Sequence, residues 1–200
     1  MNNILYTIGN KLYLNITNKC PCACTFCIRT HKDNVGNSNP LWLEREPTCE
    51  EVIAQLETRD LDSYEEIVFC GFGEPLVRID AVCEIAKFLK NITKTPIKIN
   101  TNGLCNLLHK RDITPDFQTI IDIISISLNA SNKEDYLEIT KSKFGIESFD
   151  SMLDFAQKSK LYVKDVVLSV VDVIGEEEIE KCRKICQNID VTFRVRKFES

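Results

Sequence analysis

Short strand-like segments alternate with helical segments along the chain, and this alternation restricts the fold more than any other feature. After a first strand from Leu12 to Thr17, the strand-like segments are EIVFC (66–70), IKIN (97–100), IISISLN (123–129), VVLSVV (166–171) and VTFRV (191–195). Strands connected through helices run parallel with right-handed crossovers, which predicts an α/β fold with an open doubly wound sheet or a barrel. No linker or low-complexity segment interrupts the series, so we expect a single domain over residues 1–200.

Local signals at the ends of these segments support the alternation. Thr48 with Glu51, and Ser131 with Glu134, have the spacing of capping boxes at helix starts. The N-terminal segment ILYTIGNKLYLNIT (4–17) alternates around a central Gly-Asn pair, which tolerates the positive φ of a two-residue turn. We therefore expect a β-hairpin before the first helix.

Polar residues share one face of several predicted strands. These groups are Lys98 with Asn100, Ser125 with Ser127 and Asn129, and Thr192 with Arg194 and Arg196. A doubly wound sheet is covered by helices on both faces and would leave such residues without solvent or partners. The pattern favours a partial (β/α)₆ TIM-like barrel, with the N-terminal β-hairpin as an extension and a polar interior that holds a ligand. A sheet with one face in solvent is the alternative.

Four of the ten cysteines lie in the segment CPCACTFC (20–27), directly after the first parallel strand. Clustered cysteines indicate metal binding rather than a disulfide framework. Cys20, Cys24 and Cys27 form a CxxxCxxC motif, and three thiolates can hold zinc or an iron–sulfur cluster with one open position. A closed four-cysteine site that also uses Cys22, in an electron carrier or a zinc protein, is the alternative.

The CxxxCxFC motif after a first strand resembles the signature of the radical S-adenosylmethionine (SAM) superfamily. The resemblance implies that Cys20, Cys24 and Cys27 bind a 4Fe-4S cluster, while SAM binds the fourth iron and Cys22 lies outside the pattern. Reductive cleavage of SAM then yields a 5′-deoxyadenosyl radical that abstracts hydrogen from a substrate. A flavodoxin or ferredoxin is the implied reductant.

The resemblance also assigns a SAM site along successive strand ends. The segment CGFGEP (70–75) is similar to the family's Gly-Gly-Glu-Pro motif, and its glutamate would accept hydrogen bonds from the SAM ammonium. The residues assigned in this way are Phe26 near the adenine, Gly73 and Glu74 at the ammonium, Asn100, Thr101 and Asn102 near the methionine moiety, and Ser127 and Asn129 at the ribose.

The interior arginines Arg194 and Arg196 are candidates for binding a carboxylate or phosphate of the substrate or cofactor, with solvated charge as the alternative. The chain resembles a minimal family core, most similar to the small radical SAM proteins associated with TatD-type nucleases. Its uncovered opening resembles that of glycyl-radical activating enzymes and predicts a protein or other macromolecular substrate, or a second subunit. The loop around Trp42 is the candidate lid.

Charge and composition narrow the possible partners and the cellular location of the protein. The net charge of −5 and the pI near 5.2 offer no general attraction to phosphate, so we do not expect a nucleic-acid partner. No stretch approaches the ~20 apolar residues of a membrane span, and the N-terminus lacks a secretion signal. We expect a cytoplasmic protein.

Overall fold

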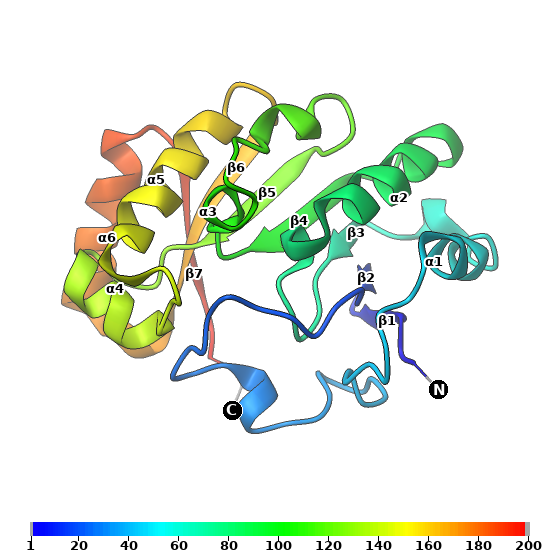
Figure 1. The fold of residues 1–200 in the computed structure, drawn as a ribbon, viewed down its shortest axis with the longest axis horizontal. Helices are drawn as coiled ribbons and strands as arrows, with labels where there is room; N and C mark the ends of the chain where they lie inside the picture. Colours follow the sequence, from blue (N-terminus) through cyan, green and yellow to red (C-terminus); the bar gives the residue numbers. More distant parts are fainter. Residues whose placement is uncertain (1, 199–200) are drawn as a thin grey trace.

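The computed structural model describes residues 2–198, and in this range one sheet of seven strands runs through the molecule (Figure 1). The strands lie side by side in chain order: β1 (Leu5–Ile8), β2 (Lys11–Leu14), β3 (Glu66–Phe69), β4 (Ile97–Thr101), β5 (Ile123–Ser127), β6 (Asp165–Val171) and β7 (Thr192–Arg196). β1 pairs antiparallel with β2, and each later pair of neighbours is parallel. Because β1 and β7 are the two edges, the sheet stays open. The predicted partial (β/α)₆ barrel with an N-terminal hairpin is confirmed.

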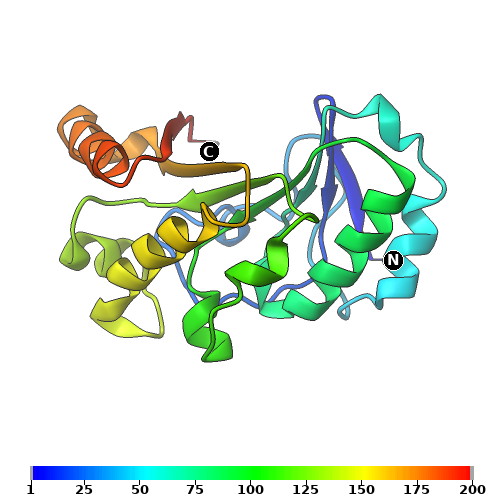
Figure 2. The same cartoon turned by 90° about the horizontal axis from the view of Figure 1, so that it is seen from above.

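Helices occupy the connections between the parallel strands. They are α1 (Cys49–Leu56), α2 (Ile79–Ile92), α3 (Cys105–His109), α4 (Lys133–Thr140), α5 (Ser148–Ser159) and α6 (Glu176–Asn188), accompanied by short 3₁₀ turns. Figure 2 shows α2, α3 and α5 along the same side of the curved sheet. Among the helices of residues 2–198, none combines the length and the apolar character needed to cross a membrane.

The two predicted capping boxes have different outcomes. The Thr48 hydroxyl accepts a hydrogen bond from the Glu51 amide and the Glu51 carboxylate accepts one from the Thr48 amide, so the box at α1 is confirmed. The box at Ser131 is wrong by one residue. Asn132 is the N-cap of α4 and accepts from the Asp135 amide, whereas the Ser131 amide donates to Glu178 on α6. The Ser131 amide is used in a contact with another helix, and asparagine at position 132 is as good an N-cap residue as serine.

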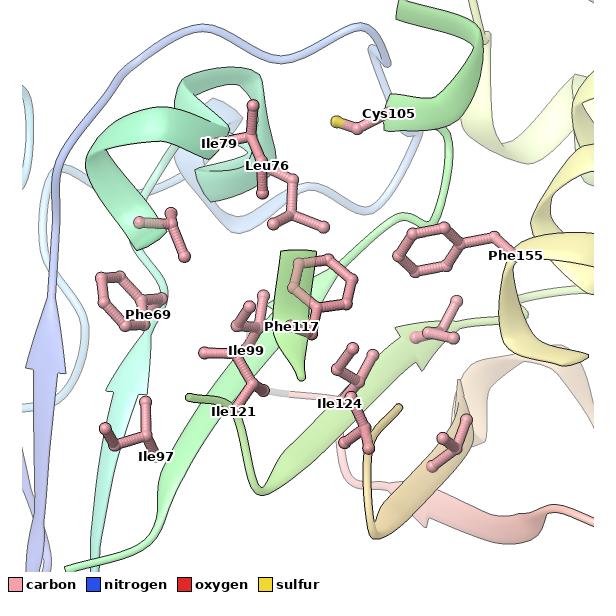
Figure 3. Close-up of a cluster of buried hydrophobic side chains, with 14 of the residues drawn as sticks. Phe69, Leu76, Ile79, Ile97, Ile99, Cys105, Phe117, Ile121, Ile124 and Phe155 are labelled. Atoms are coloured by element: carbon pink, nitrogen blue, oxygen red, sulfur yellow. The ribbon is translucent and has the colours of Figure 1, made fainter. Parts of the chain in front are cut away.

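The apolar face of the sheet packs against the helices and forms the main core. Ile99 and Ile124 on adjacent strands lie beneath Phe117 and Phe155, and these side chains are fully buried (Figure 3). Burial of one such side chain contributes about 1.5–3 kcal/mol to the free energy of unfolding. The core therefore supports the convex side of the sheet and leaves the concave side for polar groups.

The strand register aligns the polar residues on the concave face. Asn100 on β4 lies beside Ser125 on β5, and Ser127 on β5 lies beside Ser169 on β6, which in turn neighbours Arg194 on β7. These positions alternate with the buried apolar ones, as the period of a strand requires. The predicted polar interior is thus present.

The loop around Trp42 is packed against the hairpin. Leu41 is fully buried and forms a second hydrophobic cluster with Tyr6 and Phe72, and the Trp42 ring meets Phe72 edge-on with centroids 5.2 Å apart. The side-chain amide of Asn18 donates to the Leu43 carbonyl at 2.7 Å. The loop is therefore an anchored cover over the hairpin end of the sheet.

Candidate functional site

The cysteine loop follows β2 at the carboxyl edge of the sheet and is held by the end of α4. The Ala23 amide donates to the Thr140 carbonyl at 3.0 Å, and the Thr25 amide donates to the Ile139 carbonyl at 2.9 Å. A third bond runs from the Lys143 amide to the Pro21 carbonyl at 3.0 Å. These bonds satisfy carbonyls at a helix C-terminus and give the loop one conformation relative to the sheet.

Arg29, which no sequence motif indicated, clamps the same loop from the other side. Its guanidinium donates to the carbonyls of Asn18 at 3.2 Å, Phe72 at 3.3 Å and Cys22 at 3.1 Å. One planar group thus connects the residues before the loop, the turn after β3 and the loop itself. The only sequence signal for a role of Arg29 at the site was its position two residues after Cys27, the last cysteine of the motif.

Replacing Arg29 by methionine is expected to loosen the cysteine loop. The variant keeps most of the apolar stem but leaves three partly buried carbonyls without their donor, which costs about 1–3 kcal/mol of unfolding free energy. Chemical denaturation of the metal-free protein measures this loss. The exposed Arg45, replaced in the same way, serves as the control. Unchanged stability in Arg29→Met would contradict the clamp.

The thiols of the loop interact with one another. The Cys22 thiol hydrogen-bonds the thiols of Cys20 and Cys24, and this interaction lowers the pKa of Cys24 and lowers that of Cys20 to about 6, with a smaller contribution from the charge of Arg29. Burial raises the pKa of Cys27. Cys22 is buried and its sulfur faces this group. Because metal binding requires thiolates, the lowered pKa values prepare two of the three motif cysteines for that role.

The donor set fits a cluster better than a single ion. Within the described residues, no three His, Cys, Asp or Glu side chains converge as ligands of one metal ion. A zinc ion needs all of its cysteine sulfurs at a Zn–S distance of ≈ 2.3 Å, so the sulfurs must converge on one ion. In a 4Fe-4S cluster each thiolate binds a different iron, so the thiolates stay apart. Cys20, Cys24 and Cys27 are partly exposed on one clamped loop, which suits the separated thiolates that a 4Fe-4S cluster requires.

The turn after β3 packs directly on the segment that leads into the cysteine loop. A Cβ added to Gly73 would lie 2.3 Å from the Thr17 carbonyl oxygen and 2.7 Å from that of Lys19. The Glu74 amide donates to the Lys19 carbonyl at 2.8 Å. The glycine is thus required for close backbone approach within the protein, and its predicted approach to a ligand stays a prediction.

Glu74 is a buried carboxylate that connects two strand ends. It accepts hydrogen bonds from the Thr101 hydroxyl at 2.8 Å, the Asn102 amide at 2.7 Å and the Leu76 amide at 3.1 Å. Burial raises its pKa to about 8. A nearby cation such as an ammonium would favour its ionised form. Glu74 and Thr101 therefore organise the site, and the predicted contact of Glu74 with an ammonium group stays a prediction.

The strand-end amides lie at this edge as predicted. The Asn102 side-chain amide is 3.8 Å from the sulfurs of both Cys20 and Cys22, which joins β4 to the cysteine loop. Asn100 hydrogen-bonds the Cys70 thiol, the pKa of which burial raises. The methionine-binding role assigned to these amides stays a prediction.

Asn129 has the property expected of a ligand-binding residue. It follows β5 with φ of 61°, a left-handed conformation that ends the strand two residues before the predicted limit, and it is 3% exposed. Its Oδ1 atom is buried and has no hydrogen-bond partner within residues 2–198. Buried acceptors are rarely left unpaired, so a donor from a bound ligand fits this position. Ser127, on the same concave face, is partly exposed.

The remaining predicted site residues, Phe26, Arg194 and Arg196, are partly or fully exposed. Phe26 is partly exposed and belongs to neither hydrophobic cluster of the described residues, so part of its ring is free to contact a ligand. Arg194 and Arg196 are exposed on β7. The register pairs Arg194 with Ser169 of β6, so both lie on the concave face of the sheet.

Comparison with known proteins agrees with this site. A family model described as "Radical SAM superfamily" matches residues 14–188. A "Probable GTP 3′,8-cyclase" of Methanocaldococcus jannaschii is 33% identical over 133 residues, which cover 66% of this chain and 40% of the relative. A second protein of that organism, provisionally named as a glycyl-radical enzyme activating enzyme, is 29% identical over 161 residues, which cover 78% of this chain and 62% of the relative. The chain thus spans less than two thirds of either.

Solved structures show the same fold. Streptococcus suis SuiB bound to precursor peptide SuiA has a TM-score of 0.70 at 15% identity, and the match covers 98% of this chain and 40% of SuiB. Native anSMEcpe with bound AdoMet has a TM-score of 0.63 at 16% identity, with 94% and 51% covered. At these identities the likeness establishes the fold alone. The resemblance to TatD-associated proteins stays a prediction.

Proposed function

The chain belongs to the radical SAM superfamily, which implies a 4Fe-4S cluster and SAM as cofactors, and we propose that Cys20, Cys24 and Cys27 ligate that cluster. The observation that carries this proposal is the arrangement of three thiols on one loop, clamped by Arg29 and α4. The loop lies beside strand ends that present polar groups. Cys22 belongs to the same loop but falls outside the CxxxCxxC spacing, and we assign it no iron.

We further propose that SAM binds across the carboxyl edge of the sheet. Glu74 would hold the ammonium group, with Asn100 and Asn102 beside the methionine moiety, while Ser127 and Asn129 would hold the ribose hydroxyls. The unpaired Asn129 Oδ1 supports the ribose contact, and the burial of Glu74 strengthens any ion pair that it forms. When bound and reduced, the cluster would supply the electron for the reductive cleavage of SAM.

The chain's own residues would orient SAM and exclude water from the reacting atoms. Phe26 lies on the cysteine loop and offers an aromatic face for the adenine. The Trp42 loop covers the hairpin end of the sheet. Its contact with Phe72 holds it near the turn after β3, residues 70–75. Such a cover keeps stray hydrogen donors from a radical.

The substrate would bind on the concave face beside β7. Arg194 and Arg196 are exposed there and are suited to a carboxylate or phosphate. The proposed reaction is hydrogen abstraction from a protein substrate, or from a substrate enclosed with the help of a second subunit. An activating role toward a glycyl-radical enzyme is one form of this proposal, and a flavodoxin or ferredoxin would supply the electrons.

A second candidate is a non-enzymatic iron–sulfur electron carrier or a zinc protein with four cysteine ligands. The observation in its favour is the contact of the Cys22 thiol with the thiols of Cys20 and Cys24. Such a closed site has no open iron, so SAM would not alter its electronic signal.

The test is an anaerobic reconstitution with iron and sulfide followed by reduction. We expect the electron paramagnetic resonance signal of the reduced cluster to change when SAM is added, and 5′-deoxyadenosine to accumulate. A boiled sample and a sample without reductant are the controls. A reduced cluster that is indifferent to SAM would favour the electron carrier, and binding of zinc in place of iron would favour the zinc protein.

Replacing Asn129 by glycine is expected to weaken SAM binding about tenfold. Glycine adopts the left-handed backbone conformation, so the change removes chiefly the carboxamide. Loss of one hydrogen bond to a ribose hydroxyl costs about 0.5–1.5 kcal/mol. Calorimetric titration of the reconstituted protein with SAM measures the affinity, and Gly substitution at Lys110, which has φ of 53° on an exposed turn, is the control. Equal affinity in both variants would remove Asn129 from the SAM site.

A further inference from the structure

Asn102 follows β4 and is held on both sides by hydrogen bonds to its neighbours. The Leu104 amide donates to Asn102 Oδ1 at 2.9 Å, which closes a turn between the side chain and the backbone. The Asn102 amide donates to the buried Glu74 carboxylate at 2.7 Å. A Cβ added to the next residue, Gly103, would lie 2.9 Å from Ile126 Cγ2, so this turn rests directly on the core. The position and orientation of the Asn102 side chain are therefore fixed.

These contacts decide which atom of the carboxamide faces the cysteine loop. Because the Leu104 amide is a donor, the atom that it meets is the oxygen, and the nitrogen is the atom on the other side. Nδ2 donates to the sulfurs of Cys20 and Cys22, at 3.8 Å from each. An amide nitrogen carries two hydrogens, so each sulfur has its own donor. β4 thus presents a neutral, oriented hydrogen-bond donor to the thiols of the loop.

We propose that Asn102 donates a hydrogen bond to the Cys20 sulfur when the cluster is bound, and thereby makes the cluster easier to reduce. The inference rests on the proposed ligation of the cluster by Cys20 and goes beyond the proposed contact of Asn102 with the methionine moiety. A thiolate is a stronger acceptor than a neutral thiol, so this hydrogen bond becomes stronger when Cys20 is a ligand.

The effect of the donor on reduction follows from charge. One electron passes from the ferredoxin or flavodoxin to the cluster, no covalent bond forms or breaks, and the sulfurs become more negative. A hydrogen-bond donor at a ligand sulfur stabilises this added charge and raises the reduction potential. Because the Leu104 amide already orients the carboxamide, little entropy is lost in forming the bond. Asn102 acts through Cys20 and is a positioning residue.

The test compares Asn102→Ser with the parent protein, both reconstituted anaerobically without SAM. The serine oxygen can accept from the Leu104 amide in an equivalent turn, but serine lacks the carboxamide that reaches the sulfurs. We expect equal iron content. At a fixed applied potential the ratio of reduced to oxidised cluster should fall about fivefold, or about 40 mV at 59 mV per tenfold for one electron. A redox titration followed by electron paramagnetic resonance gives this ratio.

Asn102→Asp is the second variant, because aspartate keeps the size and the Oδ1 acceptor but replaces the donor by a charged acceptor. We expect the ratio to fall further than in Asn102→Ser, and this variant decides the matter if the serine protein does not fold. Asn132→Ser is the control. Asn132 also accepts from a backbone amide, that of Asp135 at 2.9 Å, but at the start of α4, whereas the cysteine loop contacts the end of that helix.

An unchanged potential in the folded Asn102 variants would overturn the inference, and so would an equal shift in Asn132→Ser. Loss of iron from both folded Asn102 variants would also overturn it, because Asn102 would then act in cluster assembly. A parent protein that binds no cluster would instead contradict the proposed function.

Discussion

Serine in place of Cys24 is expected to abolish the cluster and to reduce 5′-deoxyadenosine formation at least about a thousandfold, to the background rate. A serine hydroxyl is not ionised at neutral pH and is a poor ligand for iron. The same outcome is expected at Cys20 and Cys27, because the motif supplies only three thiolates. Iron and sulfide content, measured with the visible spectrum, detects the loss, and the product assay detects its consequence.

Cys22→Ser is the informative comparison on the same loop. The Cys22 thiol hydrogen-bonds both neighbouring thiols, and serine retains a donor at this position. We expect most of the iron to remain. Cys83→Ser on α2, far from the loop in sequence and partly exposed, controls for a general effect of removing a cysteine. If Cys22→Ser loses iron as completely as Cys24→Ser, the assignment of three ligands is wrong and the closed four-cysteine site is favoured.

Alanine in place of Gly73 is expected to destabilise the protein by about 3 kcal/mol or more and to displace the cysteine loop. The new Cβ would lie 2.3 Å from the Thr17 carbonyl oxygen and 2.8 Å from the Thr17 carbonyl carbon. Both atoms belong to the backbone, so the clash is removed only if the turn after β3 moves away from the segment that contains Thr17. This movement also breaks the hydrogen bond from the Glu74 amide to the Lys19 carbonyl. Overpacking of this kind costs about 1–3 kcal/mol, and the broken hydrogen bond adds to it.

Gly71→Ala provides the contrast, because its Cβ would meet the side chain of Asn15, with Oδ1 at 2.1 Å. A side chain can rotate away, although Asn15 would then lose its bond to the Leu41 carbonyl. We expect a smaller loss of stability and retention of iron in Gly71→Ala. Denaturation midpoints and iron content of both variants decide the matter. Equal stability and iron binding in Gly73→Ala and the parent would show that the turn after β3 can move away from the segment of Thr17 and Lys19 without cost.

Features of the site differ in how far the sequence predicts them. The thiols and the strand-end amides lie at the edge that their positions after successive strands indicate, since parallel strands bring their carboxyl ends together. Glu74 was expected as an open acceptor, yet its carboxylate already accepts from Thr101, Asn102 and Leu76. Arg29 gave no periodic or motif signal, because its role depends on carbonyl groups that other elements bring near it.

The sequence by itself determined the order of the strands, their polar and apolar faces, and the three-cysteine motif. These follow from local chemistry: alternation with a period of two, turn residues and short spacings are properties of neighbouring residues. Only the tertiary structure decided that Gly73 packs on the Thr17 carbonyl, that Asn132 rather than Ser131 caps α4, and that Arg29 donates to the Phe72 carbonyl. These contacts join residues that are far apart in sequence, and a residue's local pattern carries no information about the group that packing places against it.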